Sequence, residues 1–129
     1  MVEKIIEMEL PVGEHLAVRR NRITHGENLK GLGRISIVSG IQTGIHGDEL
    51  EGQYICYELA RRLNEGLSFL EGTVDIYPAL NPIGIDMAHR TLPMLDMDMN
   101  RLFPGRAGGD MIERMNAAII EDIVGSDIC

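Results

Sequence analysis

The sequence predicts one domain with an α/β fold, in which helices flank a mixed, largely parallel sheet. The chain has 129 residues, a length typical of one domain. Apolar residues make up 44% and charged residues 25% of it, as in ordinary globular proteins. The centre reads as strand, helix and strand, a unit that usually joins two parallel strands by a right-handed crossover.

Strands are expected where short apolar or β-branched runs lie between turn signals. The segment "RISIVSGI" is a β-branched run beside glycines, which is typical of a buried strand, whereas "EKIIEMEL" alternates less regularly. The last residues, "DIC", resemble the start of a further buried strand. The four expected strands cover residues 3–10, 15–24, 34–41 and 73–80.

Two helices are expected. The first runs from about Asp48 to Asn64, with Asp48 and Glu49 in its first turn, where acidic side chains favour the helix dipole. The second runs over about 110–124. Apolar residues at helical spacing predict the buried faces. These are Ile55, Cys56, Leu59 and Leu63 in the first helix, and Ile112, Met115, Ile119 and Ile123 in the second.

Composition excludes several partners and compartments. The net charge is −8, which argues against nucleic acid and anionic membranes, because both require clustered Lys and Arg. The two cysteines, Cys56 and Cys129, make neither a disulfide framework nor a CxxC metal motif, which suits a reducing cytoplasm. The N-terminus lacks the pattern of a signal peptide, and no apolar run is long enough to span a membrane. We therefore expect a cytoplasmic protein.

Polar residues follow two of the expected strands. Ligands of open α/β sheets bind outside the carboxyl ends of the strands, so the loops after Ile41 and Leu80 are expected at one edge. The second loop is nearly thirty residues long. Loops of that length without secondary structure of their own are usually functional.

His46 and Glu49 lie in the first loop, in "TGIHGDELEG". Imidazole and carboxylate groups suit Zn²⁺, and catalytic zinc commonly takes three protein ligands and a water. His-x-x-Glu at a loop-to-helix junction can direct both side chains to one point. The alternative is an ordinary loop, in which Glu49 only favours the helix N-terminus.

Arg90, Asn100 and Arg101 lie in the second loop. A guanidinium binds carboxylate through two parallel hydrogen bonds, and Arg90 is placed to stabilise a developing oxyanion. The alternative is a set of solvated loop charges paired with acidic neighbours, namely Asp86, Asp96 and Asp98.

Together, "GIHGDELEG", "NPIGIDMAHR" and "DMNRLFPG" resemble the succinylglutamate desuccinylase/aspartoacylase family, zinc-dependent relatives of the metallocarboxypeptidases. The resemblance implies a zinc-carboxypeptidase-like (phosphorylase/hydrolase-like) fold and hydrolysis of the amide bond of a small N-acyl amino acid. It implies that His46 and Glu49 bind Zn²⁺ and that Arg90 polarises the scissile carbonyl. Asn100 and Arg101 would then bind the substrate carboxylate. Asp98 matches an acidic residue that orients the site.

The sequence departs from the family pattern in one respect. The family's third zinc ligand, a histidine in an Asp-x-His stretch, and its general-base glutamate have no counterpart before Cys129. We therefore expect 1–129 to be the N-terminal portion of a longer catalytic domain with an incomplete fold, inactive or nearly so as it stands. A partner chain or His89 are alternative sources of the third ligand. A second reading is a stand-alone module that binds small carboxylates without hydrolysis.

An incomplete fold should leave one edge of the sheet exposed. We therefore expect a homo-oligomer that covers this edge.

Overall fold

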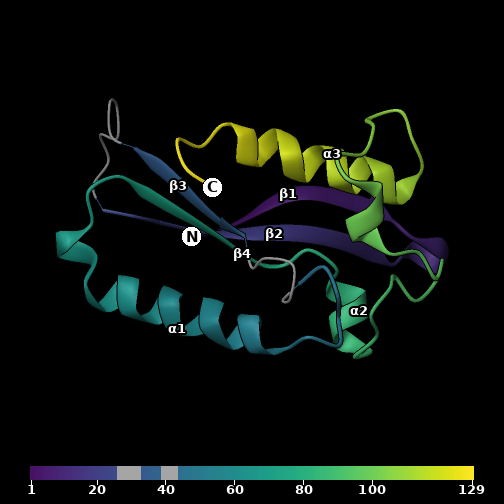
Figure 1. Ribbon diagram of the computed structural model, residues 1–129, viewed down its shortest axis with the longest axis horizontal. Coiled ribbons are helices and arrows are strands. Elements are labelled where there is room, and N and C mark those ends of the chain that lie inside the picture. The colour runs from purple at the N-terminus through teal and green to yellow at the C-terminus, as the bar shows by residue number, and fades with distance from the viewer. Residues whose placement is uncertain (26–32, 39–43) are drawn as a thin grey trace.

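The computed structural model describes residues 1–25, 33–38 and 44–129. A four-stranded sheet is covered by α1 on one face and by α3 on the other (Figure 1). No helix of these residues is long and apolar enough to cross a membrane. The strands are β1 (Val2–Glu9), β2 (His15–Thr24), β3 (Arg34–Val38) and β4 (Thr73–Ala79). The α-helices are α1 (Glu51–Glu65), α2 (Pro82–Asp86) and α3 (Met111–Val124). Three short 3₁₀-helices are η1 (Pro11–Gly13), η2 (Leu67–Phe69) and η3 (Met99–Leu102).

The sheet has the order β1-β2-β4-β3 and is mixed. Only β3 and β4 pair in parallel, through the crossover that contains α1, whereas β1–β2 and β2–β4 are antiparallel. The expectation of a largely parallel sheet is therefore wrong for the described residues. The physical reason lies in the first connection, because a short turn such as η1 can join only antiparallel neighbours.

Alternate residues of β4 point to opposite faces of the sheet, as a strand requires. Val74 and Ile76 pack with Cys56 in the core under α1. Tyr77 points the other way, into the larger core that includes Ile119 of α3. Strand β4 is thus buried on both faces, and its C-terminal end leads directly into the second loop.

Helix α1 begins later than expected. It starts at Glu51, so Asp48 and Glu49 lie in the turn before it and not in its first turn. Ile55 was expected on the buried face, but its side chain is 63% exposed. The reason is that neighbouring helical positions differ by roughly 100°, so the burial of Cys56 turns Ile55 toward solvent. Leu59 and Leu63 do pack against the sheet, as expected.

Helix α3 agrees with its expected boundaries and buried face. Asp110 caps it and forms a capping box with Glu113. Such reciprocal bonds satisfy N–H groups that the first helical turn leaves without partners. The expected face is confirmed, since three of its residues are fully buried and Ile123 is partly buried. The three are Ile112, Met115 and Ile119.

The last residues of the chain begin to pair alongside β3. Ile128 forms a parallel bridge with Ile35, and its carbonyl accepts the Ser36 N–H at 2.8 Å. The expected start of a further strand is confirmed in the backbone. The side chain of Ile128, however, is 60% exposed, so the expected burial is wrong.

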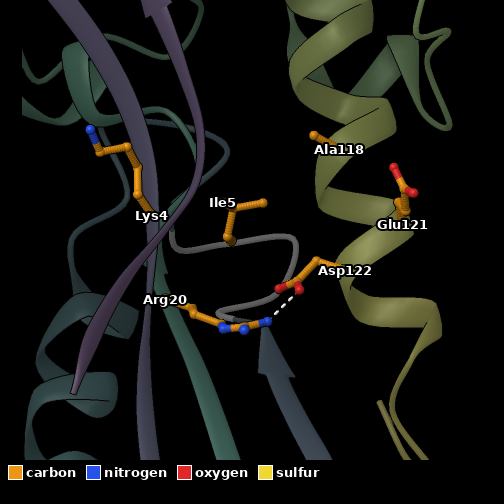
Figure 2. A pocket seen from close by; sticks show the side chains of 6 residues that line it. All are labelled: Lys4, Ile5, Arg20, Ala118, Glu121 and Asp122. Atoms are coloured by element: carbon orange, nitrogen blue, oxygen red, sulfur yellow. Dashed lines mark hydrogen bonds and ion pairs between the residues drawn. The ribbon is translucent and has the colours of Figure 1, made fainter.

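A charged network lies between the sheet and the C-terminal half of α3. Asp75 is fully buried and accepts bonds from Arg22 Nε at 2.9 Å and Arg34 Nε at 2.6 Å. Burial alone would raise the pKa of Asp75, but the bonds from Arg22 and Arg34 outweigh it and lower the pKa. Arg20 is bonded to Asp122 of α3, as Figure 2 shows. This network ties three strands and a helix together.

Candidate active site

Backbone hydrogen bonds hold the His46 loop against the second loop. The carbonyl of Gly44 accepts the N–H of Leu80, at 2.9 Å, and that of Asn81. Gly47 donates its N–H to the His89 carbonyl at 3.1 Å. The two loops therefore meet at the C-terminal end of β4, as the strand-helix-strand unit predicts.

The contact between the loops is backbone against backbone. A Cβ atom built on Gly47 would lie 1.9 Å from the carbonyl carbon of Gly84. Gly84, in α2, is itself buried. The closeness of the two loops therefore depends on glycine at position 47.

His46 and Glu49 form a pair suited to a metal ion. The His46 side chain is nearly fully buried, and its Nδ1 lies 3.5 Å from Glu49 Oε2. Neither atom has a hydrogen-bond partner among the residues that the structure describes, although buried polar atoms normally have one. Two ligands of a tetrahedral zinc ion lie roughly 3.4 Å apart, given zinc–ligand bonds of about 2.0–2.2 Å. The pair therefore fits zinc, but no group of three His, Cys, Asp or Glu side chains suited to a metal occurs among the described residues.

Asp98 faces the other nitrogen of the same ring. Its Oδ1 lies 3.3 Å from His46 Nε2 and accepts the Asn100 N–H at 3.0 Å. Burial alone would raise the pKa of Asp98, but the Asn100 N–H and the His46 ring lower it. An ionised carboxylate only accepts hydrogen bonds, so the contact between Asp98 and His46 is a hydrogen bond when Nε2 carries the proton, which leaves Nδ1 to bind a metal ion. Such a second partner commonly fixes the tautomer of a metal-binding histidine.

Two guanidinium groups lie beside the carboxylates of Glu49 and Asp98, so that five side chains form a row. Arg90 Nη1 lies 3.3 Å from Glu49 Oε1, and Arg101 Nε lies 3.5 Å from Asp98 Oδ2. The row is thus Arg90, Glu49, His46, Asp98 and Arg101. Both loops contribute to it, so the expected convergence is found.

The remaining site predictions differ in detail. Of the acidic neighbours expected to pair with the loop arginines, Asp98 pairs with Arg101, whereas Asp96 accepts a bond from Thr91. The side chain of Asn100 is exposed, on η3 beside Arg101. His89 bonds locally to Thr91 at 3.1 Å, and so does not contact His46 or Glu49 as a third metal ligand would.

Sequence reasoning missed the buried Asn81 and the helices inside the second loop. The loop was expected to lack secondary structure but contains α2 and η3. Asn81 caps α2 by accepting the Gly84 N–H at 2.9 Å. The pair Asn81-Pro82 carried the signal, since Asn before a proline at the first helical position is typical of a helix start.

A hollow of about 330 Å³ lies elsewhere, between β1, β2 and α3. Figure 2 shows its lining, which includes Arg20 and Asp122. Both charges already have partners, because Arg20 is bonded to Glu3 and Asp122. The hollow shares no residue with the row that contains His46.

Comparison with known proteins identifies the family of this chain. Residues 39–126 match the succinylglutamate desuccinylase/aspartoacylase catalytic domain. The chain belongs to this family. The match includes both loops of the candidate site, and the family is one of zinc-dependent deacylases.

The relatives of this family member are much longer proteins. Over 86 residues the chain is 34% identical to the N-alpha-acetyl-L-2,4-diaminobutyric acid deacetylase of Halomonas elongata, covering 67% of this chain and 24% of the relative. The structure resembles an aspartoacylase family protein from Mesorhizobium loti with a TM-score of 0.69 and 25% identity, covering 97% and 37% of the two chains. It resembles the product-bound ectoine utilization protein EutE from Ruegeria pomeroyi with a TM-score of 0.69 and 21% identity, again covering 97% and 37%. The chain thus spans about a quarter to a third of the length of these relatives.

Proposed function

We propose that this chain supplies part of the active site of a zinc-dependent hydrolase that cleaves the amide bond of N-acyl amino acids. The observation that carries the proposal is the buried pair of His46 Nδ1 and Glu49 Oε2, which lie 3.5 Å apart and have no hydrogen-bond partner within 1–25, 33–38 and 44–129. The arginines at both ends of the row supply the cations that an anionic substrate requires. The 34% identical relative is a deacetylase of an N-acetyl amino acid, which supports this substrate class.

Each side chain then has a role that follows from its position. His46 and Glu49 would hold zinc, and Asp98 keeps the proton of His46 on Nε2. When bound, zinc lowers the pKa of a coordinated water and polarises a carbonyl. The half-exposed Arg90 guanidinium stabilises negative charge on the carbonyl oxygen. Asn100 and Arg101, both exposed, bind the substrate carboxylate.

We further propose that residues 1–129 form the N-terminal portion of the catalytic domain. Two protein ligands hold zinc more weakly than the usual three, and no third joins His46 and Glu49 in the described part of the chain. We therefore expect weak zinc binding and little or no hydrolysis from this chain alone. Comparing it with a longer form, for zinc-dependent release of acid from N-acyl amino acids, tests this. Equal activity of the two forms would contradict it.

Zinc titration by calorimetry tests the metal site itself. We expect about one zinc per chain, with binding lost in His46→Ala. His15→Ala is the matched control, because His15 is an exposed histidine that is not part of the row. Binding that survives His46→Ala, or a wild-type chain that binds no zinc, would refute the metal site.

A second candidate function is carboxylate binding without hydrolysis. The exposure of the Arg101 side chain, 84%, favours it, since this guanidinium is open to a ligand. In the presence of a chelator, N-acetyl amino acids would then bind and Arg101→Ala would abolish binding. Arg62→Ala is the control, because Arg62 is a similarly exposed arginine on α1. Strict zinc dependence would exclude this second function.

We also propose that the protein forms a homo-oligomer. Four large apolar side chains at the start of α1 are at least half exposed, and exposed apolar patches often mark protein interfaces. Sedimentation that shows only a folded monomer at high concentration would contradict this. The side chains are Leu50, Tyr54, Ile55 and Tyr57.

A further inference from the structure

Asn81 lies at the end of β4, and its side chain touches both loops of the candidate site. The side chain is fully buried. Its Nδ2 donates to the Ile45 carbonyl at 3.2 Å and to the Thr91 carbonyl at 3.1 Å. Its Oδ1 accepts the Gly84 N–H at 2.9 Å. One amide therefore bonds the residue before His46, the residue after Arg90 and the turn of α2.

We propose that Asn81 is a positioning residue that sets the distance between the His46–Glu49 pair and Arg90. The inference rests on the proposed function, because it assigns Asn81 a role in zinc binding and in the placement of the Arg90 cation. Asn81 would not itself touch zinc or substrate. It acts through the backbone of the two loops.

The chemistry of the amide explains why this position needs asparagine. An amide group has two donor hydrogens and an acceptor oxygen, and at Asn81 both the nitrogen and the oxygen are used. Aspartate has a similar size but cannot donate, so its carboxylate would face two carbonyl oxygens. An alanine would leave both buried carbonyls without this donor, and each unsatisfied group costs about 1–3 kcal/mol.

Backbone bonds already join the two loops, and the Asn81 side chain adds a further attachment beside Arg90. The bond from Gly47 to the His89 carbonyl joins the loops on the N-terminal side of Arg90. On the C-terminal side of Arg90, the Asn81 amide bridges the Ile45 carbonyl of the first loop and the Thr91 carbonyl of the second. Arg90 is thus held at both of its neighbours, and its Nη1 comes to lie 3.3 Å from Glu49 Oε1. Without Asn81, only the first of these attachments remains.

Zinc calorimetry on wild type, Asn81→Asp and Asn81→Ala tests the proposal. We expect zinc affinity to fall about 10- to 100-fold in both variants, as for other outer-shell partners of metal ligands, because loss of the bond to the Ile45 carbonyl displaces the adjoining His46. Tyr77→Phe is the matched control, because it also removes a buried hydrogen bond, from Tyr77 to Asp122, in the remote charged network. Its zinc affinity should equal that of wild type. Wild-type affinity in both folded Asn81 variants would overturn the proposal.

A double-mutant cycle separates positioning from simple stabilisation. Arg90→Ala removes a cation beside Glu49 and should raise zinc affinity about two- to fivefold, the size of an exposed ion-pair effect. In the Asn81→Ala background the same change should have no effect, because Arg90 is no longer held near Glu49. A purely structural role predicts an unchanged Arg90 effect in both backgrounds, and that result would overturn the proposal.

Nuclear magnetic resonance of the metal-free chain keeps this inference distinct from the proposed function. In Asn81→Asp we expect amide shifts at both 45–49 and 90–91, and in Tyr77→Phe at neither. Shifts confined to one loop would overturn the positioning role. If wild type binds no zinc, the metal site of the proposed function fails, and these shifts alone decide the role of Asn81.

Discussion

Gly47→Ala is the substitution that should separate the two loops of the site. The Cβ atom that it adds would lie 1.9 Å from the Gly84 carbonyl carbon and 2.1 Å from its oxygen. Ordinary van der Waals contact between carbon atoms begins at about 3.5 Å. Both colliding groups are backbone, so no side chain can rotate away, and the loops must move apart by about 1.5 Å.

That movement has a cost that the contacts allow us to estimate. It stretches the Gly47–His89 hydrogen bond from 3.1 Å beyond bonding distance, a loss of about 1 kcal/mol. Overpacking of a tight contact adds about 1–3 kcal/mol. We therefore expect the free energy of unfolding to fall by about 2–4 kcal/mol.

Urea unfolding followed by circular dichroism measures the change. Gly108→Ala is the matched control, because a Cβ atom at Gly108 meets nothing within 4 Å, and this variant should be as stable as wild type. Zinc affinity should fall in Gly47→Ala, since Gly47 lies between His46 and Glu49 and its displacement disturbs that pair. A Gly47→Ala protein within about 0.5 kcal/mol of wild type would refute the close backbone contact.

Three further predictions concern acidic side chains. Asp75→Ala should lower the free energy of unfolding by about 3–5 kcal/mol, because it leaves the partly buried Arg22 and Arg34 without their shared anion. Urea unfolding of the variant and of wild type measures this loss. The folded-state pKa of Asp75 is depressed, so its stabilisation is complete above the unfolded pKa of about 3.9 and disappears as the pH falls through the folded value. The stability difference between wild type and Asp75→Ala should therefore narrow in unfolding curves below about pH 4, and a constant difference would contradict the depressed pKa. Asp98→Asn should weaken zinc binding about 10- to 100-fold in calorimetry while the chain stays folded, because an amide no longer fixes the proton on His46 Nε2; unchanged affinity would show that Asp98 does not orient the ring.

Local patterns in the sequence predicted most elements of the fold. Three of the expected strands and the second helix agree with the structure to within one or two residues, and so does the N-terminal end of the strand at 34–41, whose last residues lie outside the described part of the chain. The strand directions were harder to predict, because pairing depends on contacts far apart in the sequence, such as Ile23 with Val74. The exposed Ile55 shows a related limit. Periodicity locates an apolar helix face only to within a residue or two when apolar side chains also lie beside it.

The candidate site was predictable where its chemistry lies in one stretch of sequence. His46 and Glu49 share a turn, and the strand-helix-strand unit places the Arg90 loop beside them. The position of Asn81 between the loops was not predictable, because its partners at Ile45 and Thr91 are 36 and 10 residues away. A buried amide leaves no periodic pattern in a sequence. Only the hydrogen-bond geometry shows which carbonyl groups it joins.

The charges of the site would allow an acidic protein to bind the anionic substrate that we propose. The net charge of −8 acts over the whole surface, whereas binding depends on the local field of the groups that line a site. The Arg101 guanidinium is free to turn toward a ligand. Its Nε lies 3.5 Å from Asp98 Oδ2, and the Arg101 side chain is 84% exposed. Exposed ion pairs of this kind contribute about 0–1 kcal/mol, so a substrate carboxylate can replace Asp98 at little cost. Asp98 would then retain its contact with His46, and the exchange would leave the metal-binding pair undisturbed.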